Sequence, residues 1–340
     1  MHIRGETLDD LLHRVFTRIL RTGHRVSATK GDNRELFGVL LELTRPLARL
    51  SRTEIKARLF SSLGELMWYL AGADDLSFIK YYVPTYDQFS DDGKIVWGAY
   101  GPRLFNMRGV NQLAQVRDLL ERKESSRRAV IQLFNAEDIS HEHADVPCTC
   151  MMQFMVRRGH LHMFVSMRSN DAYLGLPHDV FAFTMLQELL ARDLGVGIGG
   201  YKHAVGSLHL YETNIDDARR YLDEGWQSTT PMMPMPKGDP WPAVNTLKQA
   251  EERLRRGCDI DISTLALDDY WKDLAKLLKI YALTRTRTPI GILRKVVRLK
   301  NSMSSSFYDQ YIRRREKQLG SAAKPEQLTL IEAPPGAPRS

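Results

Sequence analysis

The sequence is poor in cysteine: its 340 residues include three, Cys148, Cys150 and Cys258. A small and odd number excludes a fold held together by disulfides and fits a reducing compartment, so we expect a cytoplasmic protein. The sequence also lacks an uncharged apolar run near the roughly 18 residues that a membrane-spanning helix needs. Its first residues, MHIRGETLDDLL, have no apolar core, which argues against a secretory signal.

The composition is otherwise that of a soluble globular protein. Hydrophobic residues make up 43% and charged residues 26% of the chain, which excludes a mostly disordered or collagen-like protein. The length suits one large domain or two small ones. The net charge is +7, and 33 Arg stand against 15 Lys. A basic chain rich in Arg suits phosphate groups or another polyanion, although the codon bias of a GC-rich genome produces the same excess of Arg.

Apolar spacing predicts helices and strands that are mixed without regular βαβ alternation. Helices are predicted at 7–20, 53–70, 111–122, 177–194, 214–225, 246–256 and 268–283. Strands are predicted at 36–44, 128–134, 151–157, 160–167 and 199–210, with a hairpin turn at Arg158-Gly159. This order favours an α+β fold around one mixed sheet flanked by helices. We expect a catalytic domain over residues 1–300, followed over 301–340 by a basic helix and a flexible C-terminal tail.

The most informative stretches are DVPCTCMMQF, SMRSNDAYLGLPHD and GYKHAVGSLHLYETN. Cys148 follows a proline at the edge of a predicted strand. A lone Cys in such a place is most often inert and buried, and no second Cys/His pair has the spacing of a metal site. The arginines of these stretches change that interpretation, because guanidinium groups bind a phosphate dianion by paired hydrogen bonds and lower the pKa of a nearby thiol. The pattern therefore predicts a nucleophilic cysteine beside a phosphate site, among polar groups that suit a nucleoside.

These motifs resemble the thymidylate synthase and pyrimidine hydroxymethylase family over about residues 7–225. The matching residues are Glu65-Leu-Met-Trp68, Tyr100-Gly101, Ser126-Arg127-Arg128, Pro147-Cys148, Gln153-Phe154, Arg168-Ser169-Asn170-Asp171, Leu174-Gly175-Leu176-Pro177 and Gly206-Ser207-Leu-His209-Leu-Tyr211. The resemblance implies a homodimer of α+β subunits whose sheets pack back to back. It also implies a pyrimidine nucleotide substrate and 5,10-methylenetetrahydrofolate as co-substrate, without a metal.

Matched position by position, the resemblance implies roles for individual residues. Cys148 would attack C6 of the pyrimidine, Glu65 would manage protons through ordered water, and Tyr100 would help to remove the C5 proton. The groups expected to hold the 5′-phosphate are Arg25, Arg168 and Ser169, with Arg127 and Arg128 donated by the other subunit. The groups expected around the nucleoside are Asn170, His209 and Tyr211, and those expected toward the folate are Asp171, Gly175 and again Tyr211.

Asp179 departs from the synthases of that family, which have Asn there. An Asn amide complements uracil, whereas a carboxyl group can donate to N3 of cytosine and accept from its N4 amine. A site built for one base edge leaves buried polar groups unpaired when the other base binds. Asp179 therefore predicts a cytosine nucleotide, as in the cytosine hydroxymethylases of the family. The alternative is an Asp that faces solvent.

Three further departures concern the folate side. The stretch PTYDQF lacks the Trp of the synthases, His178 replaces an aromatic residue, and the C-terminal EAPPGAPRS differs from the apolar synthase tail that closes over the folate. A less sealed pocket admits water to an exocyclic methylene group on the base. Together with Asp179, these departures predict hydroxymethylation in place of methylation.

The sequence thus favours a cytidylate 5-hydroxymethyltransferase. We expect CMP rather than dCMP, because Ala172 and Ser207 are smaller than the usual family residues and would leave room for a 2′-hydroxyl. Such an enzyme would fit nucleoside antibiotic biosynthesis. The alternatives are a dCMP hydroxymethylase and a thymidylate synthase acting on dUMP.

A rival from another class is a nucleic-acid-binding protein on an inactive enzyme fold. Its phosphate-binding residues would be Arg313-Arg314-Arg315 and Lys317, on a helical pattern near Tyr308 and Tyr311. A solvated surface helix explains the same pattern, and the intact set around Cys148 argues against an inactive enzyme. We therefore expect small-molecule partners, and neither nucleic acid nor a membrane.

Overall fold

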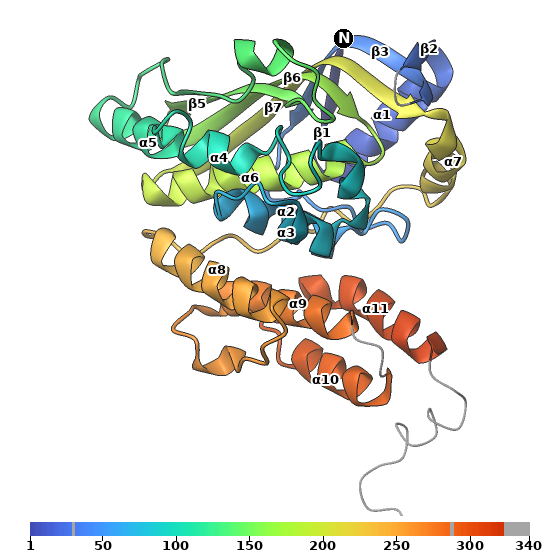
Figure 1. The fold of residues 1–340 in the computed structure, drawn as a ribbon, viewed down its shortest axis with the longest axis vertical. Helices are drawn as coiled ribbons and strands as arrows, with labels where there is room; N and C mark the ends of the chain where they lie inside the picture. Colours follow the sequence, from blue (N-terminus) through green and yellow to red (C-terminus); the bar gives the residue numbers. More distant parts are fainter. Residues whose placement is uncertain (29–30, 286–288, 323–340) are drawn as a thin grey trace, which may run out of the picture. The chain divides into compact units, whose positions relative to one another are not determined.

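The computed structural model describes residues 1–28, 31–285 and 289–322 (Figure 1). Contacts divide the chain into two compact units, Met1–Pro242 and a second unit that begins at Ala243. The boundary predicted at residue 300 does not coincide with this division, and the extent of the catalytic domain stays a prediction. The predicted flexible tail lies, from residue 323 onward, outside the described residues.

The first unit is built on a seven-stranded mixed sheet in the order β1-β3-β7-β6-β5-β4, with β2 paired to β3. The pairs β1–β3 and β6–β7 are parallel, and the other pairs are antiparallel. The strands are β1 (His2–Gly5), β2 (His24–Ala28), β3 (Gly31–Leu43), β4 (Val130–Gln132), β5 (Thr149–Arg157), β6 (His160–Asp171) and β7 (Gly197–Tyr211).

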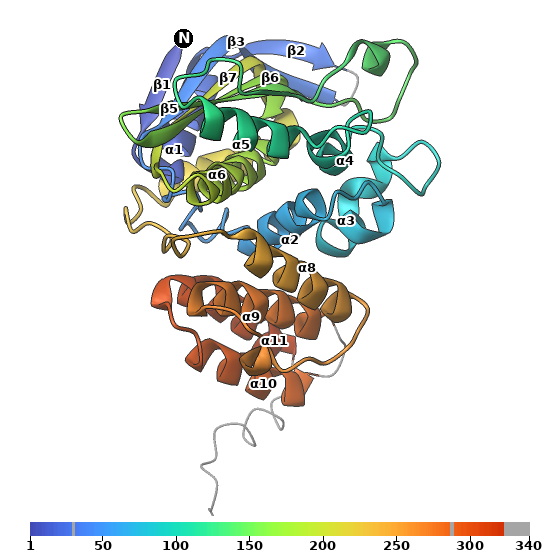
Figure 2. The same ribbon diagram turned by 90° about the vertical axis from the view of Figure 1, so that its left-hand side faces the viewer.

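Helices α1 and α6 pack on one face of this sheet, and α2 packs on α6 (Figures 1 and 2). Helix α6 is buried on nearly every side, which explains its long run of apolar residues. The helices of this unit are α1 (Leu8–Thr22), α2 (Leu59–Leu70), α3 (Leu76–Tyr82), α4 (Tyr100–Phe105), α5 (Gln112–Arg122), α6 (Gly175–Asp193) and α7 (Ile215–Asp223). The α+β expectation is therefore confirmed.

The opposite face of the sheet carries half-buried and exposed side chains. Phe37 on β3 is 84% exposed, and Met151, Met155 and Phe164 on β5 and β6 are half-buried. Water contact with apolar groups of this size is unfavourable. Burying this face of the sheet under another protein surface would therefore be energetically favourable.

The sequence predicted the hairpin between β5 and β6 correctly. Arg158 and Gly159 have φ angles of 53° and 69°, the left-handed pair that a two-residue turn between twisted strands requires. The helix predicted over 53–70 begins only at Leu59. Residues before it form an irregular segment, because the Thr53 hydroxyl accepts the Lys56 N–H at 3.0 Å and holds a local turn. Strands β1 and β2 and helices α3 and α4 were not predicted, since each is shorter than eight residues.

The Pro-rich segment after α7 is anchored to the first unit. Met232 and Met235 are buried, and the Met235 N–H donates to Glu188 on α6 at 2.7 Å. Glu188 is also ion-paired with the fully buried Arg49. The segment thus contributes to the core of the first unit.

The second unit is helical in the residues that the structure describes. Its helices are α8 (Trp241–Arg255), which starts just before the unit boundary, α9 (Asp269–Thr284), α10 (Pro289–Asn301) and α11 (Asp309–Ala322). Its core contains Leu247, Trp271, Leu278, Val296 and Ile312. Searched over both units, the described helices include none that is long and apolar enough to cross a membrane.

Candidate active site

Arg168 holds the backbone around Cys148. Cys148 is half-buried and directly precedes β5. Its carbonyl accepts the Arg168 N–H at 2.8 Å, and the Arg168 guanidinium donates to Pro147 O at 3.0 Å and to Val146 O at 2.8 Å. The structure thus brings together the predicted nucleophile and a predicted phosphate ligand.

Gly206 on β7 makes this arrangement possible. A Cβ atom at that position would lie 2.7 Å from the Arg168 carbonyl oxygen, closer than atoms pack. Only glycine therefore lets β7 run beside β6 at Arg168 without displacing it.

Tyr100 lies at the start of α4, and its hydroxyl reaches the residue after Cys148. It accepts hydrogen bonds from Thr149 N at 3.1 Å and from Thr149 Oγ1 at 2.9 Å. Burial raises the pKa of Tyr100 well above its ordinary value, and Asp179 and Cys148 raise it further. Tyr100 therefore keeps its proton at neutral pH, and Thr149 fixes where that hydroxyl sits. Sequence reasoning did not identify Thr149.

Glu65 is buried on α2 and is held by two tyrosines. Its Oε1 accepts from Tyr69 at 3.0 Å and from Tyr86 at 2.8 Å. Glu65 is therefore not an exposed helix carboxylate: it is 7% exposed. Sequence reasoning missed both tyrosines, although Tyr69 is four residues from Glu65 on the same helix, a spacing that puts side chains on one face. Tyr86 lies in the PTYDQF stretch and also packs edge-on against Trp68.

Asp179 and Asn170 form a buried pair between α6 and β6. Asn170 Nδ2 donates to Asp179 Oδ2 at 2.6 Å, and a Cβ atom at Gly175 would lie about 3.5 Å from both partners. Burial raises the pKa of Asp179 to about 8, and Glu65 adds to the rise. The alternative of a solvent-facing Asp is therefore wrong: Asp179 is 9% exposed. Among the described residues, Asn170 Oδ1 has no hydrogen-bond partner although it is buried.

The parallel pairing of β6 and β7 aligns the residues predicted to bind phosphate and sugar. Ser169 lies opposite Ser207, and Asp171 lies opposite His209. Ser169 Oγ is 3.4 Å from His209 Nδ1, and the His209 and Tyr211 rings meet edge to face. The structure thus brings these predicted residues together at one end of the two strands.

Glu35 on β3 joins this group and was missed by sequence reasoning. It lies opposite His209 in the β3–β7 pairing and accepts a hydrogen bond from Ser207 Oγ at 2.5 Å. Ala172, the other small residue noted in the sequence, is fully buried. Its N–H donates to the His209 carbonyl at 2.8 Å, so both small residues lie beside His209, and Ser207 is the one whose side chain bonds Glu35.

The other predicted phosphate ligands are not gathered in one place. Arg25 is exposed on β2 opposite Arg34, which in turn lies opposite Leu210 of β7. Arg127 and Arg128 are exposed just before β4, at the far edge of the sheet. Within one chain, strands β5 and β6 therefore separate these two arginines from β7.

Residues at the predicted folate side surround a tight turn. Asp171 Oδ1 accepts from Tyr173 N at 2.7 Å and from Leu174 N at 2.9 Å. Lys56 donates to the Tyr173 carbonyl and lies 3.1 Å from the centroid of its ring, and burial lowers the pKa of Lys56 to about 7. Burial likewise lowers the pKa of His178, whose Nδ1 donates to Leu174 O at 3.0 Å. His178 is therefore neutral at pH 7.

No group of three or more His, Cys, Asp or Glu side chains converges on a possible metal position in the part of the chain that the structure describes. The polar groups that do converge are the thiol, carboxyl, hydroxyl, imidazole and guanidinium groups described above. That set can add a nucleophile to an electron-poor ring and move protons around it.

Comparison with curated proteins finds phage relatives. A protein named deoxyuridylate hydroxymethyltransferase from Delftia phage PhiW-14 is 30% identical over 222 residues, which cover 60% of this chain and 61% of the phage protein. A protein of the same name from Bacillus phage SP01 is 32% identical over 230 residues, covering 63% and 58%. The chain therefore spans about three fifths of the length of these relatives.

The family model described as thymidylate synthase matches residues 11–271. This range contains the Cys148 segment, the Glu65 helix, the Asn170–Asp179 pair and the strand ends of β6 and β7. The chain belongs to the thymidylate synthase family.

Proposed function

We propose that the protein is a folate-dependent pyrimidine nucleotide hydroxymethyltransferase that acts on a cytidylate, and on CMP in preference to dCMP. The observation that carries the base preference is the Asn170–Asp179 pair. Because the pKa of Asp179 is about 8, the acid is mainly protonated at pH 7. Oδ2 accepts from Asn170, so the proton belongs on Oδ1.

The pair therefore offers one donor, on Asp179, and a buried acceptor, Asn170 Oδ1, that has no partner among the described residues. Cytosine has an acceptor at N3 and two N–H donors on its N4 amine, which match both. Uracil has a carbonyl oxygen in place of that amine. It would leave the Asn170 oxygen unpaired, and an unpaired buried acceptor costs about 1–3 kcal/mol.

The reaction assigned to these residues begins at Cys148. Its thiolate adds to C6 of the pyrimidine, which makes C5 nucleophilic toward the one-carbon unit. Loss of the C5 proton, with Tyr100 positioned to help, and release of the carrier leave a methylene group on C5. Water, held by Glu65 and its two tyrosines, adds to that group, and expulsion of Cys148 restores the ring. The atoms balance as nucleotide, methylene carrier and water giving hydroxymethyl nucleotide and tetrahydrofolate.

The co-substrate 5,10-methylenetetrahydrofolate supplies a carbon at the oxidation level of formaldehyde. The residues around the Asp171 turn fit such a group. Asp171 accepts the Tyr173 and Leu174 N–H groups at Oδ1, which leaves Oδ2 for a donor on the carrier. Leu174 beside it is 51% exposed and supplies an apolar contact. Asp171, Gly175 and Tyr211 are therefore the residues assigned to hold the carrier.

The ribose preference rests on Glu35 and Ser207. A carboxylate accepts a hydrogen bond from a hydroxyl group more strongly than a neutral oxygen does, and Glu35 lies opposite His209, the residue assigned to the sugar. A 2′-hydroxyl would add a donor to that carboxylate, which dCMP lacks. A hydroxymethyl-CMP product would suit nucleoside antibiotic biosynthesis in the cytoplasm.

The proposal includes a homodimer with sheets packed back to back. The exposed Phe37 and the half-buried Met151, Met155 and Phe164 supply an apolar face for such packing. Arg127 and Arg128, exposed at the far edge of the sheet, would then complete the phosphate site of the partner. Analytical ultracentrifugation of the protein and of a Phe37→Asp variant tests this part: a monomeric wild type contradicts it.

A second candidate is a deoxyuridylate hydroxymethyltransferase, which the names of the phage relatives favour. One competition assay separates the candidates. The protein is incubated with methylenetetrahydrofolate and equal CMP, dCMP and dUMP, and products are identified by mass spectrometry, with Cys148→Ala as the inactive control. Hydroxymethyl-CMP supports the proposal, a hydroxymethylated uracil nucleotide supports the second candidate, and a methylated product contradicts both.

A further inference from the structure

The excess of positive over negative charge in the chain is confined to one short region. Residues 285–317 contain ten of the 48 Lys and Arg residues and two of the 41 Asp and Glu residues. The other 307 residues hold 38 basic and 39 acidic side chains and are nearly neutral. The family match ends at residue 271, so the catalytic family does not account for this region.

Helices α10 and α11 bury their apolar residues and expose their cations. Ile292 and Val296 of α10 and Tyr311 and Ile312 of α11 are buried. The exposed cations, which we call the α10–α11 cationic surface, are Arg294, Lys295, Arg298, Arg313, Arg314 and Lys317. This distribution is typical of a surface that binds polyanions.

Two other cations of these helices have a structural role. Lys300 on α10 pairs with Glu316 on α11 at 2.7 Å. Arg315 lies 4.8 Å over the Tyr281 ring of α9 and donates to Thr284 Oγ1 at 3.0 Å. These contacts hold α9, α10 and α11 together, so the cationic surface has a rigid support.

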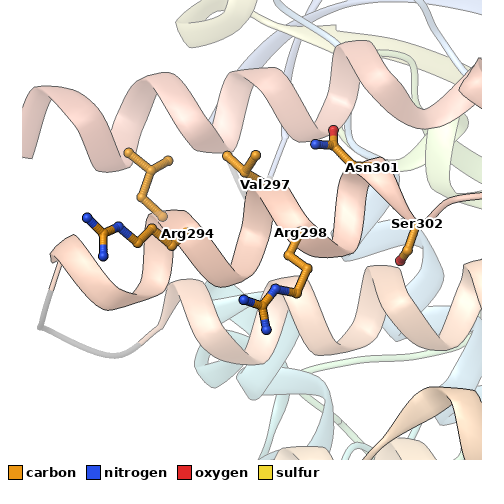
Figure 3. A pocket seen from close by; sticks show the side chains of 6 residues that line it. Arg294, Val297, Arg298, Asn301 and Ser302 are labelled. Carbon is orange, nitrogen blue, oxygen red and sulfur yellow. The ribbon is translucent and has the colours of Figure 1, made fainter. Parts of the chain in front are cut away.

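A hollow of about 520 Å³ lies along α10 and is lined, among the described residues, by Leu293, Arg294, Val297, Arg298, Asn301 and Ser302 (Figure 3). Arg294 and Arg298 are one turn apart, about 6 Å along the helix axis. Leu293 and Val297 are half-buried and supply the apolar floor of the hollow. A phosphodiester chain offers this combination, since its phosphates suit guanidinium groups and its sugars suit an apolar floor.

Other polyanionic partners fit less well. A membrane-surface helix needs exposed large apolar residues to enter the lipid, and the exposed large apolar residues of the described chain all lie in the first unit. Tyr308 and Tyr311, the aromatic residues near the basic run, are buried, so they are not available to stack on bases. Recognition is therefore by charge along the phosphate backbone rather than by base stacking.

We propose that the α10–α11 cationic surface binds the phosphate backbone of nucleic acid, so that a nucleotide-modifying enzyme is held on nucleic acid by its helical unit. This proposal does not depend on which nucleotide the first unit modifies. It differs from the expectation from sequence that nucleic acid is not a partner.

The test uses the full-length protein and labelled single-stranded and duplex DNA of about 30 nucleotides, followed by fluorescence anisotropy between about 50 and 200 mM salt. We compare wild type with Arg294→Gln/Lys295→Gln/Arg298→Gln. The matched control, Arg219→Gln/Arg253→Gln/Arg256→Gln, removes the same charge from exposed positions elsewhere. For duplex DNA, each lost phosphate contact reduces the slope of log affinity against log salt concentration by about 0.9. The slope of the α10 variant should therefore be smaller than that of wild type by up to about 3. The variant should also bind at least tenfold more weakly.

Several results would overturn the proposal. One is a wild type that does not bind either DNA at the lowest salt. Another is an equal loss in the matched control, which would mean that net charge alone is responsible. Displacement of the DNA by CMP would place binding at the nucleotide site instead. Binding to vesicles containing phosphatidylserine, without binding to DNA, would assign the surface to a membrane. Unchanged circular dichroism and thermal melting of each variant keep a folding defect from imitating the expected loss.

Discussion

Asp179→Asn should stabilise the protein in a pH-dependent way. The carboxyl group has an ordinary pKa of 3.8, and burial raises it to about 8 in the folded protein. Above pH 4 the unfolded chain releases this proton while the folded chain keeps it. The contribution of Asp179 to stability is therefore fully present below about pH 4 and is lost as the pH rises toward 8.

The size of the effect follows from the shift. Each pH unit between the two pKa values costs 1.36 kcal/mol, so the loss at pH 7 is about 4 kcal/mol relative to acid, and the loss between pH 5 and pH 7 is about 3 kcal/mol. An Asn side chain has nearly the shape of the protonated acid and does not ionise. Its carbonyl can still accept the Asn170 N–H. The substitution should therefore remove the loss of stability at neutral pH without leaving a cavity.

Urea unfolding at pH 5 and pH 7 measures the prediction. The stability gain of Asp179→Asn over wild type should be about 3 kcal/mol larger at pH 7 than at pH 5. Asp216→Asn, at a position 89% exposed, is the control and should show no such difference. A gain that is equal at the two pH values would mean that Asp179 is not protonated in the folded protein, and the argument for its base preference would fail with it.

The same substitution should change the base preference. The ordinary amide complements uracil in the synthases that this sequence resembles, so Asp179→Asn should lose roughly a hundredfold or more of kcat/KM with a cytidylate while gaining activity on a uridylate. The wild-type rate with a cytidylate should fall as the pH rises through about 8, because the ionised carboxylate cannot donate to N3. A flat profile across that range would contradict the role of the proton.

Four further predictions follow from the site. Cys148→Ser should abolish turnover while nucleotide binding remains, as single-turnover assays and calorimetry would show; substantial turnover would contradict the covalent step. Glu65→Gln should lower kcat more than it raises KM, because Glu65 is assigned to proton transfer and not to substrate binding. Glu35→Gln should lower the ratio of hydroxymethylated CMP to hydroxymethylated dCMP in the competition assay. An unchanged ratio would mean that Glu35 does not recognise the sugar. Gly206→Ala should lower the unfolding free energy by about 1–3 kcal/mol and impair activity, since its methyl group would meet the Arg168 carbonyl 2.7 Å away.

The chemistry of the site could be inferred from sequence because it resides in short local motifs. The Pro147-Cys148 step and the Arg168–Asp171 run show their residue types directly, and family membership agrees with them. Helix α1 could be predicted in the same way, because Thr7 caps it and Asp10 completes a capping box within four residues. Such features depend on neighbours in the chain, so a sequence contains all of the information they need.

Contacts between distant segments could not be inferred in the same way. Glu65 is buried against Tyr86, 21 residues away, and Ser207 binds Glu35, 172 residues away. Neither pair has a spacing that a periodic pattern reveals. The arginine-rich end of the chain was visible in the sequence, but that its tyrosines are buried while its cations face solvent depends on the packing of α9, α10 and α11.

The sequence by itself determined which reactive groups this protein has, since the identity and order of its side chains are local facts. Only the tertiary structure decided their state. Asp179 keeps a proton near neutral pH because α6 and β6 remove it from water next to Glu65, and Asn170 presents an unpaired acceptor because the same packing directs its amide at Asp179. Desolvation and hydrogen-bond geometry depend on what surrounds a side chain in space. The sequence therefore identifies Asp179 as unusual, and the fold gives it the protonation and the neighbours that suit recognition of cytosine.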